Sequence, residues 1–397
     1  MSTPSLRPIV APRIHSIDIL RGLTIAFMIL VNDPGDYQQI FPILDHAEWN
    51  GYTPADVIFP NFLFLAGASL VFSLHGRIRS GSARLPLARA LGRRTVNLLL
   101  LMLFLAGLPT FRYRRVRIFG VLFRTAVCSL AVGLILLVTL SVPILLALIA
   151  SLLALYWVAL RFLPIPGLGR PIVDQPLLDP DNNLAAWLDR EVARFFRRQL
   201  HTGALYNLTH DPEGLLSSVP ATATMLIGSC AALLMLSGTR TPAQKASLLT
   251  FSGLASLSAG HLWHRSFPIN KNLWTSSYVL ATAGWSLLAL AALYTLFDIK
   301  KIERSSPAAR ALAQPAKIFG ANAIVVYAVS VSLAKIARTV HLQHHGHSLS
   351  LRTFVYRKLF APTRSTPARS LAFAITFAAV CFLPNLVLWR KKIFVKI

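Results

Sequence analysis

The chain has 397 residues, of which 54% are hydrophobic and only 14% are charged, and its formal net charge is +25. Soluble globular proteins carry about 25% charged residues, so this composition excludes an ordinary soluble enzyme and indicates a membrane protein. The positive charge does not indicate a nucleic-acid partner, because the lysines and arginines lie in connectors between apolar runs, where they act as topology signals.

Apolar segments long enough to cross roughly 30 Å of hydrocarbon recur along the whole chain. A window of roughly 19 residues predicts about ten of them, and therefore an all-α polytopic membrane bundle that forms a single domain over residues 1–397. The predicted spans are 16–33, 53–74, 93–109, 119–140, 142–162, 218–237, 246–264, 273–296, 316–337 and 369–390.

The distribution of lysine and arginine predicts the orientation of these spans. The connectors at 77–94 and 300–317 and the tail from Arg390 are dense in cations, whereas residues 33–52 carry none. The positive-inside rule therefore places both termini in the cytoplasm and residues 33–52 on the opposite side. Two groups of arginines argue for the reverse orientation: Arg112, Arg114 and Arg115, and Arg197 and Arg198.

The longest connector, at about 163–217, is expected to be an extracytoplasmic loop segment. It contains apolar residues at helical spacing with charges between them, which is typical of a helix lying in the membrane interface. Such a helix could be a lid over a site or an anchor for the loop. The apolar residues are Leu184, Trp187, Leu188, Val192 and Phe195.

Asn32, His46 and Asp56 form the sharpest polar group, because a turn-rich connector can fold His46 back between the ends of the first two spans. An aspartate that accepts a hydrogen bond from one imidazole N–H fixes the tautomer and leaves the other nitrogen free to take a proton or attack a carbonyl. A nearby asparagine amide can orient the ring or stabilise an oxyanion. The alternative is that Asp56 simply caps the helix that follows Thr53 and Pro54.

Other ionisable residues lie at the edges of predicted spans. Asp211 and Glu213 suit either a helix start or contact with a cationic amine. Arg124 and Lys271 could hold a polyphosphate, or their side chains could snorkel to the headgroups.

The sequence predicts neither a metal site nor a disulfide. The histidines at 341, 344, 345 and 347 lie in a polar loop without a cysteine or carboxylate partner nearby. The three cysteines, Cys128, Cys230 and Cys381, are isolated within apolar runs.

Several separated blocks of this sequence resemble the membrane-bound heparan-α-glucosaminide N-acetyltransferase family, including its bacterial relatives. Any one block alone would be weak evidence, but together and in this order they are specific, and the resemblance covers nearly the whole chain. The blocks are SIDILRGLT at 16–24, VNDPG at 31–35, HAEWNGYTPAD at 46–56, DPEGLL at 211–216, PINKNLWT at 268–275 and GANA at 320–323.

The resemblance implies a multi-span enzyme that takes acetyl from cytoplasmic acetyl-CoA and delivers it to the amine of an amino sugar on the other face. It assigns His46 as the active-site histidine, with Asn32 and Asp56 as its partners. His46 would act as a nucleophile that forms an acetyl-imidazole or as a general base, and the sequence leaves both open. We expect acetyl-CoA contacts at Arg124, Lys271 and Asn322, and acceptor contacts at Asp211, Glu213, Trp49 and Asn50.

Two residues depart from the family pattern. Asn61 stands where the family usually carries an aromatic residue, and His210 stands where tyrosine is common. Both departures bear on the identity of the acceptor.

We therefore expect an acetyltransferase of the bacterial inner membrane, with acetyl-CoA as co-substrate and no metal. Its expected partners are membrane lipid and an extracytoplasmic amino sugar or glycan, with a homodimer left open and no nucleic acid. The rival interpretations are a transporter or flippase for such a sugar, and a membrane O-acyltransferase that acts on a hydroxyl.

Overall fold

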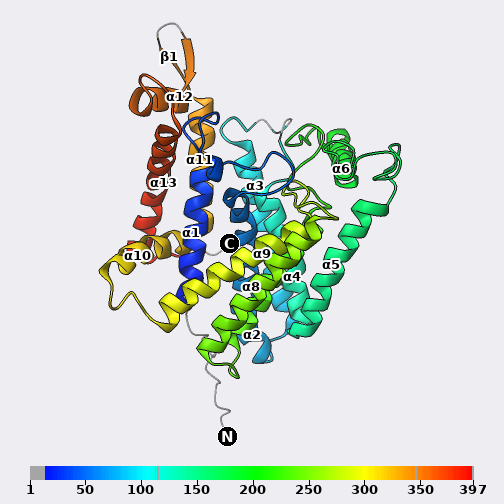
Figure 1. The fold of residues 1–397 in the computed structure, drawn as a ribbon. Helices are drawn as coiled ribbons and strands as arrows, with labels where there is room; N and C mark the ends of the chain where they lie inside the picture. The colour runs from blue at the N-terminus through cyan, green and yellow to red at the C-terminus, as the bar shows by residue number, and fades with distance from the viewer. Residues whose placement is uncertain (1–13, 112, 114–115, 345–346, 396–397) are drawn as a thin grey trace.

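The computed structural model describes residues 14–395 except 112, 114–115 and 345–346. The described chain is a bundle of helices with one short antiparallel hairpin (Figure 1). Its long helices are α1 (His15–Asn32), α2 (Ile58–Arg79), α3 (Arg84–Gly107), α4 (Val121–Val138), α5 (Val142–Phe162), α6 (Leu184–Leu200), α7 (Ser218–Leu236), α8 (Pro242–His264), α9 (Ser276–Leu293), α10 (Pro307–Ala321), α11 (Ala323–Thr339) and α13 (Pro367–Arg390).

Shorter elements occupy the connectors. Two 3₁₀ turns, η1 and η2, lie between α1 and α2, and two π-helical segments, η4 and η5, extend α9 and α12. The hairpin pairs β1 with β2 and precedes α12; the histidine at 345 lies outside the described residues. Their bounds are η1 (Pro42–Leu44), η2 (Pro54–Val57), η4 (Tyr294–Ile299), β1 (His341–His344), β2 (His347–Ser350), α12 (Leu351–Val355) and η5 (Tyr356–Phe360).

The all-α polytopic prediction is confirmed, with a somewhat different number of spans. Among the described residues, 8 helices are long and apolar enough to cross a membrane, or up to 9 if one bent pair counts as a span. That pair is α10 and α11, which meet at 81° around Asn322, where the sequence predicts one straight span. The predicted span 246–264 forms α8 but is absent from the 8, because polar residues within it, such as Ser252, Ser256 and His261, lower its hydropathy.

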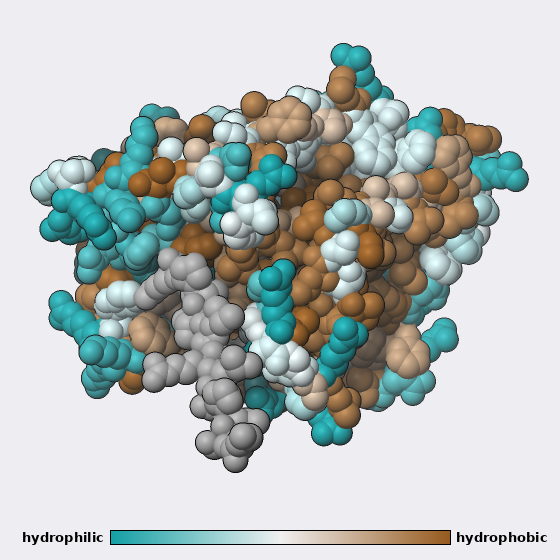
Figure 2. Space-filling view, turned by 90° about the horizontal axis from the view of Figure 1, so that it is seen from below, coloured by the Kyte–Doolittle hydropathy of each residue, from teal (hydrophilic) through white to brown (hydrophobic). Residues whose placement is uncertain are grey.

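The helices run up and down between two faces, and the connectors collect accordingly. In Figure 1 the segments 33–57, 163–217 and 265–275 gather on the upper face, as does the hairpin, whereas the starts of α1 and α8 lie at the lower end. Figure 2 looks at the lower face and shows hydrophilic side chains around its rim with hydrophobic ones between them. The polar connector that carries His46 therefore lies on the face opposite the start of α1.

Helices α2 and α7 pack through a reciprocal pair of glycines. A Cβ built on Gly67 of α2 would lie 1.9 Å from the backbone oxygen of Met225, and one built on Gly228 of α7 would lie 1.8 Å from that of Phe64. In a membrane, small residues let helix backbones approach closely enough for van der Waals packing. The α2–α7 contact therefore holds α2, which begins two residues after Asp56, against the centre of the bundle.

Gly228→Ala should lower the melting temperature, because even one methyl group must displace the α2 backbone. Overpacking costs about 1–3 kcal/mol, and a clash with backbone belongs at or above the top of that range. Gly92→Ala in α3 is the matched control, since its Cβ would meet nothing within 4 Å. Equal melting temperatures for the two variants would contradict the close α2–α7 contact.

Candidate active site

His46 and Asp56 form a hydrogen-bonded pair at the upper end of α2. The imidazole Nδ1 lies 2.7 Å from Asp56 Oδ1. The Asp56 side chain is fully buried, whereas that of His46 is 40% exposed. A buried acceptor thus fixes one edge of the ring, and the other edge faces outward.

The connector is folded around the Asp56 carboxylate. Oδ2 accepts hydrogen bonds from the backbone N–H groups of Ala47 and Thr53, both at 3.0 Å. The Tyr278 hydroxyl donates to the backbone oxygen of Asp56 at 2.6 Å. The Asp56 side chain therefore caps the start of η2 and also binds the His46 imidazole. The sequence left the cap and the histidine partner as alternatives, and one side chain fills both roles.

Lys271 is the third member of this cluster. Its Nζ lies 3.0 Å from Asp56 Oδ1 and 3.0 Å from His46 Nδ1. The segment that carries it is fastened to the connector by Gly51, whose N–H donates to Ile269 at 2.7 Å. Because the Lys271 ammonium can only donate, Asp56 Oδ1 is the acceptor that it shares with the imidazole; an Nδ1–H donated to that oxygen leaves the lone pair on Nε2.

Asn32 is not joined to this cluster in the described structure. It ends α1 with an exposed side chain, and its backbone oxygen accepts from the Tyr37 hydroxyl at 3.0 Å. The buried polar residue at this point is Asp33, with Oδ1 3.5 Å from Arg338 Nη2. Burial raises the pKa of Asp33 to about 6, against the opposing effects of Arg338 and Arg352.

Asp211 and Glu213 share one cation that the sequence analysis missed. Arg117 Nε donates to Asp211 Oδ2 at 2.6 Å, and Arg117 Nη2 contacts both carboxylates. Both proposed acceptor contacts are thus already paired with a guanidinium. No local signal identifies Arg117, because its partners lie more than 90 residues away in the sequence.

Arg117→Ala should destabilise the protein strongly, because it leaves two carboxylates without their shared cation. Breaking a buried ion pair costs on the order of 3–5 kcal/mol. Arg194→Ala is the matched control: that arginine forms an exposed pair with Glu191 at 2.7 Å, which is worth about 0–1 kcal/mol. A thermal melt in detergent measures both, and a parent-like melt for Arg117→Ala would contradict the assignment.

Helix α6 supports the loop that carries these carboxylates. The long connector therefore contains a helix, as the sequence predicts. Asn183 caps α6 by accepting from Ala186 N–H at 2.8 Å. The buried Asp189 accepts from the N–H groups of Leu215 at 3.1 Å and Asp211 at 3.3 Å. Burial raises the pKa of Asp189 to about 7, with the Leu215 hydrogen bond opposing it.

Arg124 and Asn322 lie in different surroundings from each other and from Lys271. Arg124 is fully buried, contacts Ser217 Oγ, and has its guanidinium 4.7 Å from the Trp274 ring centre. Its Nε and Nη1 have no partner among the described residues. The Asn322 amide donates to Ile393 at 3.0 Å and accepts from Val395 at 2.8 Å. These three expected acetyl-CoA contacts do not form one cluster.

Trp49 and Asn50 connect the His46 segment to neighbouring loops. The Trp49 indole donates to the backbone oxygen of Leu178 at 2.9 Å, and its ring packs edge-on against His210 at 5.4 Å. Asn50 accepts a hydrogen bond from Asn270 at 3.3 Å. The connector around His46 is therefore held on one side by the 163–217 loop and on the other by the 268–275 segment.

Comparison with known proteins supports the resemblance seen in the sequence blocks. Residues 13–179 match the family model described as heparan-alpha-glucosaminide N-acetyltransferase, catalytic. The chain is 27% identical to the human protein of that name over 430 aligned residues, which cover 97% of this chain and 60% of the human one. The chain is thus similar to heparan-alpha-glucosaminide N-acetyltransferases over nearly its whole length.

The mouse heparan-alpha-glucosaminide N-acetyltransferase is also 27% identical, over 439 aligned residues that cover 99% of this chain and 62% of that protein. The chain thus spans about 60% of the length of the curated relatives it matches. Within this relationship, His46, Asp56 and Arg124 lie in the part matched by the family model, whereas Asp211, Lys271 and Asn322 lie beyond it.

Proposed function

We propose that this chain is a transmembrane acetyltransferase that moves an acetyl group from cytoplasmic acetyl-CoA to the amine of an extracytoplasmic amino sugar or glycan. The observation that carries the proposal is the 2.7 Å contact between His46 and the buried Asp56 in a bundle of apolar helices. The relatives named as N-acetyltransferases support the reaction class.

The proposed chemistry uses the outward edge of the imidazole. With Nδ1–H donated to Asp56, the Nε2 lone pair could attack the thioester carbonyl, so that acetyl passes to nitrogen and CoA leaves as the thiolate. The acceptor amine would then take the acetyl group from the imidazole. Alternatively, Nε2 could remove the proton from the amine as the amine attacks the thioester directly. Both routes give one N-acetyl product and one CoA.

The proposed orientation places both termini in the cytoplasm of a bacterial inner membrane. His46 lies on the upper face in Figure 1, whereas the cation-dense connector between α2 and α3 lies at the lower end. Placing the cationic face in the cytoplasm follows the positive-inside rule and puts His46 outside. The acetyl group, rather than the polyanionic CoA, would then pass through the bundle.

A transporter is the second candidate, and the 81° break at Asn322 is the observation that favours it. Broken helices frame the substrate sites of many transporters, since their free backbone groups can bind ions or substrate. Here, however, the Asn322 side chain bonds backbone groups of the chain's own tail at Ile393 and Val395. We therefore favour the acetyltransferase.

Proteoliposomes with glucosamine inside and acetyl-CoA outside separate the two candidates. The acetyltransferase should form N-acetylglucosamine inside the vesicles and release an equal amount of CoA outside. Only protein whose lower face points out of the vesicle can use the external acetyl-CoA. The protease accessibility of an added tag measures the fraction of protein in this orientation. Movement of unmodified glucosamine without loss of thioester would contradict the proposal.

A further inference from the structure

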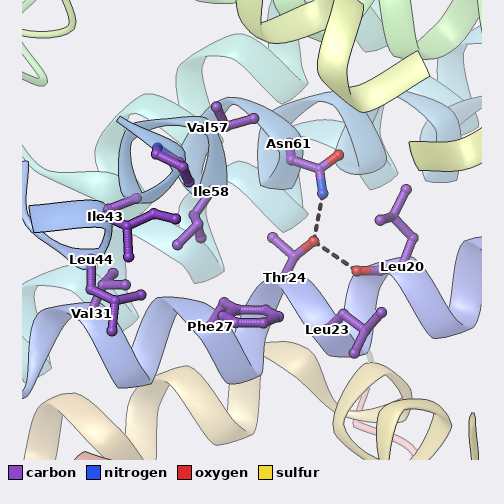
Figure 3. Close-up of a pocket in the computed structure, with 12 residues that line it drawn as sticks. Leu20, Leu23, Thr24, Phe27, Val31, Ile43, Leu44, Val57, Ile58 and Asn61 are labelled. Carbon is purple, nitrogen blue, oxygen red and sulfur yellow. Dashed lines mark hydrogen bonds between the residues drawn. The ribbon is translucent and has the colours of Figure 1, made fainter. Parts of the chain in front are cut away.

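An apolar cavity of about 400 Å³ lies between α1 and α2, directly beneath the two short helices of the His46 connector (Figure 3). Small-molecule sites in proteins have volumes of roughly 300–1,000 Å³, so this cavity is large enough to hold a ligand. Among its lining side chains are Leu23, Phe27 and Val31 of α1, Ile43 and Leu44 of η1, and Ile58 of α2.

One buried polar atom in this cavity lacks a partner. Asn61 of α2 is only 9% exposed, and its amide donates to Thr24 Oγ1 at 2.7 Å. The Thr24 hydroxyl in turn donates to Leu20 at 2.7 Å, so its proton is already used. Asn61 Oδ1 is therefore left without a hydrogen bond among the described residues. A buried acceptor in this state favours a ligand that brings an O–H or N–H group.

The mouth of the cavity is apolar. Phe27, on the candidate span α1, is 49% exposed, and Ile43 of η1 is 62% exposed. In a membrane, an exposed phenylalanine on a spanning helix faces hydrocarbon rather than water. A hydrocarbon chain could thus enter between α1 and α2 from the bilayer without crossing a polar barrier.

Part of the cavity wall is formed by sequence neighbours of His46 and Asp56. Ile43 and Leu44 come just before Asp45 and His46, and the lining residues Pro54, Ala55 and Val57 flank Asp56. A chain bound in the cavity therefore lies against the same connector that holds the imidazole.

We propose that this cavity binds the hydrocarbon chain of the acceptor, so that the substrate is an amino sugar carried on a lipid. A hydroxyl or N–H group of the bound molecule donates to Asn61 Oδ1. The inference rests on the proposed function and narrows its substrate class. The pantetheine arm of CoA fits this cavity poorly, because its two amides would need several polar partners and the cavity offers one free acceptor.

Kinetics with alkyl glucosaminides of increasing chain length test the proposal in nanodiscs. Burial of each methylene is worth about a fourfold gain in affinity, so KM should fall steeply with chain length until the cavity is full. Leu23→Trp, which fills the cavity, should raise KM for dodecyl glucosaminide at least tenfold and leave kcat/KM for free glucosamine unchanged. Leu100→Trp is the control for partition into the bilayer, because Leu100 on α3 is 58% exposed.

Asn61→Leu is a second variant, which preserves the side-chain size and removes the free acceptor. We expect a KM for dodecyl glucosaminide about fivefold above that of the parent. Both variants are first required to melt as the parent does. The proposal would be overturned if KM fell as steeply with chain length in Leu23→Trp as it does in Leu100→Trp.

A photoreactive dodecyl glucosaminide provides a readout independent of turnover. It should label peptides of α1 and α2 in the parent protein. The labelling should be at least fivefold weaker in Leu23→Trp. A phosphatidylcholine with the same photoreactive chain should not label these peptides. Equal labelling by phosphatidylcholine would mean an ordinary bilayer lipid and would overturn the proposal. Transfer to free glucosamine without this labelling would overturn the inference and leave the proposed function standing. Labelling without transfer to any amine would overturn the proposed function, and with it the acceptor assignment.

Discussion

His46→Ala should reduce amine-dependent release of CoA from acetyl-CoA by on the order of 10³-fold or more. General acid–base groups typically contribute 10²–10⁴-fold, and a nucleophile that forms a covalent intermediate is at least as important. The substitution removes a side chain that is 40% exposed, so the fold should survive. The rate per folded molecule, measured with a thiol reagent that detects CoA, checks this prediction.

His347→Ala is the matched control for loss of a histidine, because His347 lies in the hairpin and is exposed. It should turn over as the parent does. Trapping with radiolabelled acetyl-CoA in the absence of an amine then separates the two mechanisms: a nucleophilic His46 leaves label on the parent protein, and a general base does not. Parent-like turnover by His46→Ala would remove the histidine from the mechanism.

Asp56→Asn should lower kcat by on the order of 10²-fold, mainly through the tautomer and orientation of His46. An amide carries no negative charge to offset Lys271, which lies 3.0 Å from Asp56 Oδ1, and it is a weaker acceptor than the carboxylate for the imidazole N–H at 2.7 Å. Its NH₂ group would also face the N–H donors of Ala47 and Thr53, which costs about 1–3 kcal/mol. The kcat of the folded fraction and the melting temperature measure the two effects separately.

Glu48→Gln controls for the loss of one negative charge on the same connector, since Glu48 is exposed. Tyr278→Phe tests the support beneath Asp56: it removes the O–H donated at 2.6 Å and leaves the carboxylate intact. We expect parent-like rates for Glu48→Gln and a smaller loss for Tyr278→Phe than for Asp56→Asn. Full activity of Asp56→Asn would mean that the imidazole needs no positioning carboxylate.

Much of the fold could be predicted from hydropathy, because a helix that crosses hydrocarbon must be long and apolar whatever its neighbours are. There are two exceptions, one with a local cause and one with a distant cause. Polar residues such as Ser256 and His261 keep α8 from qualifying by composition, although it lies alongside α9 in Figure 1. The break at Asn322 is stabilised by backbone groups about 70 residues further along, which no local pattern shows.

The site was predictable where its parts are close in sequence. His46 and Asp56 are 10 residues apart across a turn-rich connector, so their contact follows from local geometry. The contact between Lys271 and His46 depends on the tertiary fold, because the two residues are 225 positions apart in the sequence. The pairing of Arg117 with Asp211 arises in the same way. Asn32 is the opposite case: it is close to His46 in the sequence, but its side chain does not contact the imidazole.

The most direct test of the central claim is the stoichiometry of the reaction by purified parent protein in nanodiscs. Acetyl-CoA and glucosamine are mixed, and the N-acetylated sugar and free CoA are quantified together by mass spectrometry. The account predicts equal amounts of both products, CoA release that depends on the amine, and loss of both products in His46→Ala. Folded parent protein that forms no N-acetylated product with free or alkyl-linked glucosamine would contradict it.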